Sequence, residues 1–154
     1  MRLLALDPGA KTGAAVFVRS DSEGWTLLGA RTCSPDDVSR LPWGPVNVVV
    51  IENPEIYARS KARPRDILKL ARIVGRYEER FLGSTIRLVT PHEWKGSIDG
   101  DIMTKRILAS LNAVEARLCA GVDHNAIDAV GIGKWALRQP WMRALTPADP
   151  RDVG

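Results

Sequence analysis

Cysteine and histidine are scarce in this sequence, with two residues of each among its 154. Cys33 and Cys119 lie far apart, so no disulfide framework is indicated, and a reducing, cytoplasmic location is the expectation. The scarcity also argues against a zinc site, which depends on clustered Cys and His ligands. The length favours one domain, able to bury on the order of two-thirds of its unfolded surface.

Long hydrophobic runs are lacking as well. No apolar stretch approaches the ~18 residues of a membrane span, so no membrane partner is expected. Asp7 interrupts the first apolar run, which is therefore not typical of a signal peptide. Internal repeats, low-complexity segments and the phosphate-binding P-loop pattern are also absent. We expect a single domain over residues 1–154, with the proline-containing tail 140–154 folded over the surface or partly mobile.

The charge is mildly positive, because 22 Lys and Arg outnumber 18 Asp and Glu. Such a balance favours nucleic acid or another polyanion as partner, although only weakly.

Hydrophobic patterning predicts a mixed α/β domain. A nearly continuous β-branched run, VNVVVIEN at 46–53, indicates a central strand buried on both faces. Apolar residues at helical spacing predict a helix over 66–82. The remaining predicted elements are strands at 2–6, 13–18, 25–30 and 85–90, and helices at 104–118 (interrupted near Asn112) and 123–138 (capped by Asp123).

Three acids stand in apolar settings. Asp7 and Glu52 each follow a predicted strand, and Asp128 lies within an otherwise apolar helix. Taken singly, Asp7 fits a turn residue, Glu52 a salt-bridged strand end, and Asp128 a surface position. Adjacent strands ending at one sheet edge would bring Asp7 and Glu52 together, and their repulsion would then favour a bound cation. Carboxylate ligands suit Mg²⁺ or Mn²⁺.

Four motifs occur in an order that resembles a known family. They are LALDPGAKTGAAVF, VVVIENPEIYARSKA, VTPHEWK and NAIDAVGIGKWA, and they cover residue 2 to about residue 138. Together they resemble the RuvC-type Holliday junction resolvases of the RNase H-like (retroviral integrase) superfamily. The resemblance implies an RNase H-like mixed five-stranded sheet flanked by helices.

The resemblance also implies an activity. The chain would be a metal-dependent endonuclease that cleaves four-way or other branched DNA, with Asp7, Glu52 and Asp128 as catalytic metal ligands for two Mg²⁺ or Mn²⁺ ions. Family members act as homodimers, and helix 66–82 is the candidate interface. A bacterial or phage-type intracellular protein is expected, without indication of a helicase or motor partner.

One position departs from the family pattern. The family supplies a fourth acidic ligand three residues before the last Asp, where this chain has the neutral Asn125. His124 lies one turn before Asp128 and could substitute as a metal ligand. Asp123 lies about 140° around the helix from Asp128 and is interpreted as a cap.

Several residues are candidates for DNA contact. Lys95 and Lys105 match family lysines near the scissile phosphate, and Tyr57 matches an aromatic residue that stacks on an unpaired base. A basic loop would contact phosphates, or else be a solvated charged loop; its residues are Arg59, Lys61, Arg63 and Arg65.

Other functions stay open at this point. A less structure-selective flap or fork nuclease would have the same fold, and so would a non-catalytic DNA-binding domain. An actin-like ATPase would need two such domains, which this length does not supply. Four tryptophans are interpreted as packing residues: Trp25, Trp94, Trp135 and Trp141.

Overall fold

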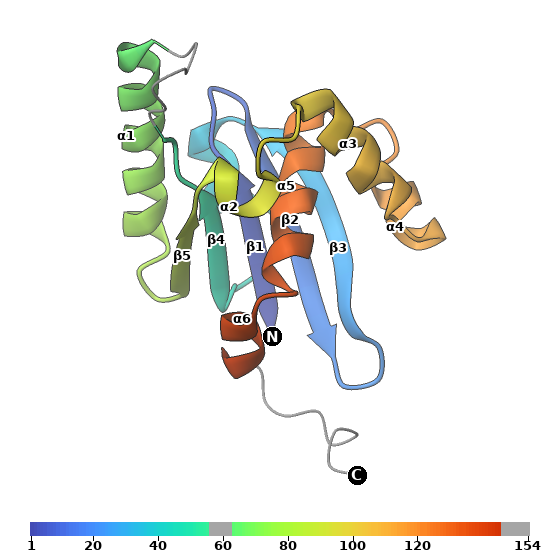
Figure 1. The fold of residues 1–154 in the computed structure, drawn as a ribbon. Coiled ribbons are helices and arrows are strands. Elements are labelled where there is room, and N and C mark those ends of the chain that lie inside the picture. Colours follow the sequence, from blue (N-terminus) through green and yellow to red (C-terminus); the bar gives the residue numbers. More distant parts are fainter. Residues whose placement is uncertain (56–62, 146–154) are drawn as a thin grey trace.

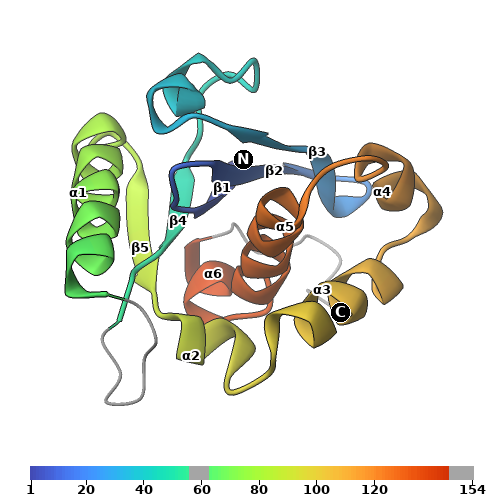
Figure 2. The same ribbon diagram turned by 90° about the horizontal axis from the view of Figure 1, so that it is seen from above.

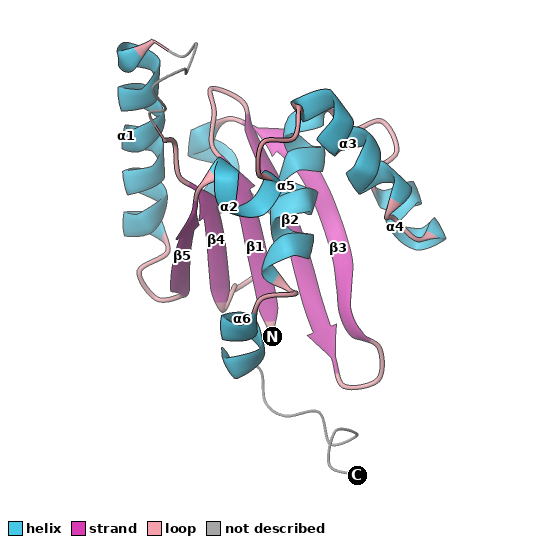
Figure 3. Cartoon of the chain, viewed as in Figure 1, coloured by secondary structure: helices cyan, strands magenta, loops and turns pink. Residues whose placement is uncertain are grey.

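One five-stranded mixed sheet forms the centre of the fold (Figures 1 and 3). The computed structural model describes residues 1–55 and 63–145. The spatial order is β3-β2-β1-β4-β5. Strand β2 runs antiparallel to both of its neighbours, β1 and β3, whereas β4 and β5 run parallel to β1. The bounds are β1 Arg2–Asp7, β2 Thr12–Ser20, β3 Gly24–Cys33, β4 Val48–Glu52 and β5 Thr85–Val89. The predicted mixed sheet is therefore confirmed, although β3 extends beyond its predicted end at residue 30.

Helices cover both faces of this sheet (Figure 2). The 3₁₀ helix η1 and α1 lie on one face, and α5 lies across the other together with α2, α3 and α6. The bounds are η1 Pro35–Arg40, α1 Pro64–Arg80, α2 Pro91–Lys95, α3 Gly100–Ala109, α4 Ala113–Leu118, α5 His124–Ala136 and α6 Pro140–Leu145. Among the described residues, none of the helices has the length and apolar character needed to cross a bilayer.

Strand alternation divides the core into two layers, because successive side chains of a strand point to opposite faces. In β1, Leu3 and Ala5 pack in the layer that contains residues of α5, whereas Leu4 and Leu6 pack in the layer that contains residues of α1. β4 follows the same rule, and its residues 48–51 are at most 1% exposed. The continuous apolar run therefore marks a strand covered on both sides, as the sequence predicts.

The apolar face of α1 is used within the chain. Ile67, Val74 and Tyr77 are buried, and the Tyr77 hydroxyl lies 2.6 Å from the hydroxyl of buried Thr12 in β2. Val74 and Tyr77 pack in the same core layer as strand residues of the sheet, so the interpretation of this apolar face as a dimer interface is wrong for these two residues. Leu68 and Leu82 remain 64% and 77% exposed.

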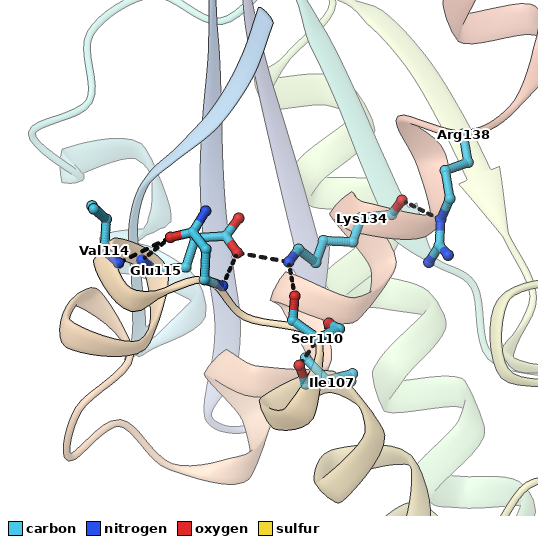
Figure 4. Close-up of polar contacts among 7 residues, drawn as sticks. Ile107, Ser110, Val114, Glu115, Lys134 and Arg138 are labelled. Carbon is cyan, nitrogen blue, oxygen red and sulfur yellow. Dashed lines mark hydrogen bonds and ion pairs between the residues drawn. The ribbon is translucent and has the colours of Figure 1, made fainter. Parts of the chain in front are cut away.

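The predicted helix 104–118 is interrupted at Asn112, as expected. Asn112 caps α4 by accepting hydrogen bonds from the backbone N–H groups of Val114 and Glu115, and the Glu115 side chain accepts one from the Asn112 N–H. Glu115 Oε2 also lies 2.8 Å from Lys134 Nζ, which donates to the Ser110 carbonyl at 3.1 Å (Figure 4). These contacts fasten α4 to α5.

The first part of the predicted tail forms a helix that packs on the rest of the domain. Residues Pro140–Leu145 form α6, whose Met142 is 1% exposed and packs in the α5 layer of the core. The Arg87 guanidinium of β5 lies 5.8 Å from the centre of the Trp141 ring. Residues 146–154 lie outside the described residues. The four tryptophans interpreted as packing residues all contact this core layer.

Candidate active site

Asp7 and Glu52 end neighbouring parallel strands. Leu6 of β1 pairs with Ile51 of β4, so the next residues, Asp7 and Glu52, lie side by side at the edge of the sheet. By strand alternation both acids belong to the face that packs against α5. The edge of the sheet where β1 and β4 end therefore carries two adjacent acids on the face that packs against α5.

Helix α5 brings Asp128 to the same place. The helix starts at the upper end in Figure 1, where Asp123 caps it by accepting a hydrogen bond from the Ala126 N–H at 3.3 Å. The Thr32 hydroxyl of β3 donates to the same carboxylate. The predicted capping role of Asp123 is therefore confirmed.

A close contact with β2 holds the first turn of α5 against the sheet. Gly13, which pairs with Asp7, lies so near α5 that a Cβ there would be 1.8 Å from the Asn125 carbonyl oxygen. Only glycine permits this approach. The contact sets how far Asp128 stands from the two strand-end acids.

Burial raises the pKa of all three acids, and the charge of a neighbouring acid adds to the rise at Asp7 and Glu52. Burial raises the pKa of Asp7 to about 8, with further contributions from the charges of Glu52 and Asp128. Burial likewise raises the pKa of Glu52, although Lys95 and the hydrogen bond from Trp94 oppose that rise. The pKa of Asp128 is also raised by burial, and Lys95 and His124 act against it. The acids are thus near enough to influence one another electrostatically.

Among the described residues, Lys95 is the cation whose charge acts on all three acids. Lys95 Nζ lies 3.9 Å from Glu52 Oε2, and its charge lowers the pKa of each of the three acids. Asp128 Oδ1 is buried and has no hydrogen-bond partner within the described part of the chain. In the residues that the structure describes, one ammonium group faces three acids, and one buried carboxylate oxygen is left without a partner.

This donor set fits a hard divalent cation, which prefers carboxylate oxygen ligands. Among residues 1–55 and 63–145, however, no three His, Cys, Asp or Glu side chains are close enough to form a ready ligand group. Electrostatic coupling extends further than direct ligation, so the two observations are compatible. Glu52 Oε2 is engaged by the Trp94 indole N–H and by Lys95.

The two candidates for a fourth ligand lie on the first turn of α5. His124 is exposed, and its charge acts on the carboxylates of Asp123 and Asp128. The Asn125 side chain lies near the Asp123 carboxylate and contributes to lowering its pKa. In this arrangement Asn125 supports the helix cap, while His124 contributes charge near Asp128.

The candidate DNA contacts lie at different places. Lys95 is at the carboxylate site, Lys105 is exposed on α3, and exposed Arg63 precedes α1 as its N-cap. Tyr57, Arg59 and Lys61 lie outside the described residues. Trp94, which the sequence assigned to packing, does pack, but it also donates a hydrogen bond to Glu52. Its one sequence signal is its place directly before Lys95.

Comparisons with known proteins identify the fold through structure rather than sequence. No protein-family model matches the chain, and no curated protein matches it in sequence. The solved Thermus thermophilus RuvC structure matches with a TM-score of 0.60 and 14% identity, covering 96% of this chain and 100% of that one. T. thermophilus RuvC in complex with a Holliday junction substrate matches with a TM-score of 0.54 and 15% identity, covering 95% and 98%. This chain therefore has the RuvC-type, RNase H-like fold.

Proposed function

We propose that the protein is a metal-dependent endonuclease that hydrolyses phosphodiester bonds in four-way (Holliday) or other branched DNA. The observation that supports this most directly is the convergence of Asp7, Glu52 and Asp128 beside a single lysine, with a buried Asp128 oxygen left unpartnered. Protein sites rarely concentrate uncompensated charge unless a ligand balances it. Mg²⁺ or Mn²⁺ is the ligand that this chemistry favours, with up to two ions per site.

The proposed roles follow from the positions of the residues. The charges of both Glu52 and Asp128 raise the pKa of Asp7. Asp7 would therefore be the central ligand, with Glu52 and Asp128 as the other two. A bound cation would activate a water for attack on the phosphodiester and stabilise the leaving oxygen. Lys95 would neutralise part of the carboxylate charge and attract the scissile phosphate.

Branched DNA is the proposed substrate because the neighbour with this fold was solved with a Holliday junction. The net charge of +4 suits a polyanion. Lys105, Arg63 and the segment carrying Tyr57, Arg59 and Lys61 are the proposed DNA contacts. A single domain acting as a homodimer would match the twofold symmetry of a junction, with a surface other than the buried face of α1 at the interface.

A cleavage assay tests the proposal. The protein is incubated with a synthetic four-way junction, a flap and a plain duplex, each with Mg²⁺ or with EDTA. We expect Mg²⁺-dependent cutting of the junction in preference to the duplex. Preferential cutting of the flap would identify a flap or fork nuclease instead. Junction binding without any cutting at any Mg²⁺ or Mn²⁺ concentration would identify a non-catalytic DNA-binding domain.

The DNA-contact proposal has its own measurement. Replacing Arg59, Lys61 and Arg63 by Ala removes three candidate phosphate contacts. Each lost contact should reduce the log–log slope of affinity against salt by about 0.9 on duplex arms. An unchanged slope would mean that these side chains face solvent in the complex.

A further inference from the structure

Helix α2 is a short but firmly held element beside the acids. Thr90 and Glu93 form a reciprocal capping box, with the Thr90 N–H donating to Glu93 Oε2 at 2.7 Å and the Glu93 N–H donating to Thr90 Oγ1 at 3.2 Å. Pro91 starts the helix. Trp94 and Lys95, which follow Glu93, are therefore presented from a fixed backbone.

The Trp94 ring packs in the core layer that also contains residues of α5, α3 and the sheet. Its side chain is 7% exposed and belongs to the same core layer as Ile107 and Val130. Gly131 makes room for the ring, since a Cβ there would lie 3.0 Å from Trp94 Cζ3 and 2.5 Å from Ile107 Cδ1. Gly131 lies on α5 three residues after Asp128. The Trp94 ring therefore packs against the helix that carries Asp128, while its indole N–H donates to Glu52.

Both polar groups of this pair are directed at one oxygen. The Trp94 indole N–H donates to Glu52 Oε2 at 2.5 Å, and Lys95 Nζ lies 3.9 Å from the same atom. Lys95 Nζ is also 4.9 Å from the centre of the Trp94 ring, a cation–π distance. Within the described residues, Glu52 Oε1 has no hydrogen-bond partner.

We propose that Trp94 is a positioning residue that fixes Glu52 through Oε2 and so leaves Oε1 as the oxygen that ligates the cation. This inference rests on the proposed function, because it concerns the same carboxylate site. A carboxylate that accepts a hydrogen bond from an indole packed against α5 loses the freedom to rotate away from Asp7 and Asp128. Hydrogen-bond partners of metal ligands commonly contribute about 10-fold or more to metal affinity.

The first test uses the indole N–H as a spectroscopic reporter and needs no cleavage. In protein labelled with ¹⁵N-tryptophan, the five tryptophans give five indole signals. We expect the Trp94 signal at low field in the metal-free protein, shifted by Glu52→Gln and shifted again when Mg²⁺ is added to the parent protein. A Trp94 signal that is unaffected by Glu52→Gln would overturn the proposal.

The second test separates positioning from packing. Trp94→Phe keeps an aromatic ring but removes the N–H, and Trp25→Phe is the matched control in the same core layer. We expect the Mg²⁺ midpoint of Trp94→Phe to rise about 10-fold, in calorimetry without DNA and in cleavage, with most of the rate recovered at saturating Mg²⁺. The control should keep the parental midpoint.

Equal midpoints for Trp94→Phe and the parent would overturn the inference, even if both proteins cleave. An equal rise in the Trp25→Phe control would also overturn it, because the effect would then come from general loosening of the core. Failure of the parent to cleave any branched DNA would count against the proposed function alone, since the indole signal and the calorimetric midpoint do not depend on cleavage. If Trp94→Phe does not fold, the parent and Glu52→Gln spectra still decide the matter.

Discussion

Helix α5 contributes to two groups of half-buried charged residues, and their charge balance differs. Around Lys134, one acid meets one base: Glu115 is 11% exposed and Lys134 is 20% exposed, with 2.8 Å between the charged atoms. Around Asp128, three acids share Lys95, whose nearest carboxylate oxygen is 3.9 Å away. The first group has the balanced charge and backbone hydrogen bonds of a structural contact. The second is unbalanced, and this imbalance is what supports the proposal of a cation site there.

The largest effect is expected from the unbalanced group. Asp7→Asn removes the proposed central ligand, and losing several kcal/mol of transition-state stabilisation corresponds to a rate reduction of about 1,000-fold or more. Binding to a four-way junction should persist, and above pH ~8, where the metal-free Asp7 is ionised, it should strengthen because one negative charge near the phosphates is removed. Single-turnover cleavage and gel-shift assays on the same preparation measure both effects. Full cleavage activity in this variant would contradict the assignment of the site.

The balanced group should respond in stability rather than in activity. Lys134→Met leaves Glu115 half-buried without its partner, which is expected to cost about 3 kcal/mol in the free energy of unfolding. The double variant Glu115→Gln/Lys134→Met should recover much of that loss. Urea unfolding measures the stabilities, and cleavage per folded molecule should stay at the parental level. A double variant as unstable as the single one would show that packing of the lysine stem, rather than charge, matters there.

The pH dependence of metal-free stability sharpens the contrast. Asp7 titrates at about 8 in the folded protein, against an ordinary value of 3.8. Its raised pKa means that the folded state binds the proton more tightly, so the stabilisation is complete below pH ~4 and lost as the pH rises through ~8. Unfolding in EDTA should show this decline, on the order of a few kcal/mol, and Asp7→Asn should flatten it. An identical profile in parent and variant would mean that Asp7 is ionised normally.

The sequence predicted most of the fold because local patterns and burial agree. The unbroken apolar run of β4 predicts a strand whose two faces are both covered by helices. Asp128 was recognisable because it is a charged residue in an otherwise apolar helix. Strand ends placed Asp7 and Glu52 at one edge once β1 and β4 were parallel neighbours. Their proximity follows from the topology alone.

Contacts between distant segments could not be predicted in this way. Trp94 and Glu52 are 42 positions apart, and Lys134 and Glu115 are 19 apart, so neither pairing leaves a periodic signal. The apolar face of α1 was equally ambiguous, because periodicity shows that a face is buried but not whether the sheet or a second subunit covers it. The α6 helix was missed because its short, proline-led segment is stabilised by burial of Met142.

The smallest effect is expected from a substitution in the first turn of α5, which would add one more negative charge to the group around Asp128. Asn125→Asp places a fourth carboxylate three residues before Asp128, on the same side of the helix. The added negative charge favours a second divalent cation, so the Mg²⁺ midpoint for cleavage should fall a few-fold, and any advantage of Mn²⁺ should shrink. The variant also replaces a side chain that helps to lower the pKa of Asp123 by one that repels it, so its metal-free stability should decrease slightly. His124→Ala is the companion variant: a ligating imidazole predicts a higher Mg²⁺ midpoint and loss of the Mn²⁺ advantage, whereas a surface residue predicts no change. Metal titrations of the cleavage rate measure both variants. If neither curve moves, the fourth ligand lies elsewhere, and Asp123 becomes the next residue to test despite its role as the helix cap.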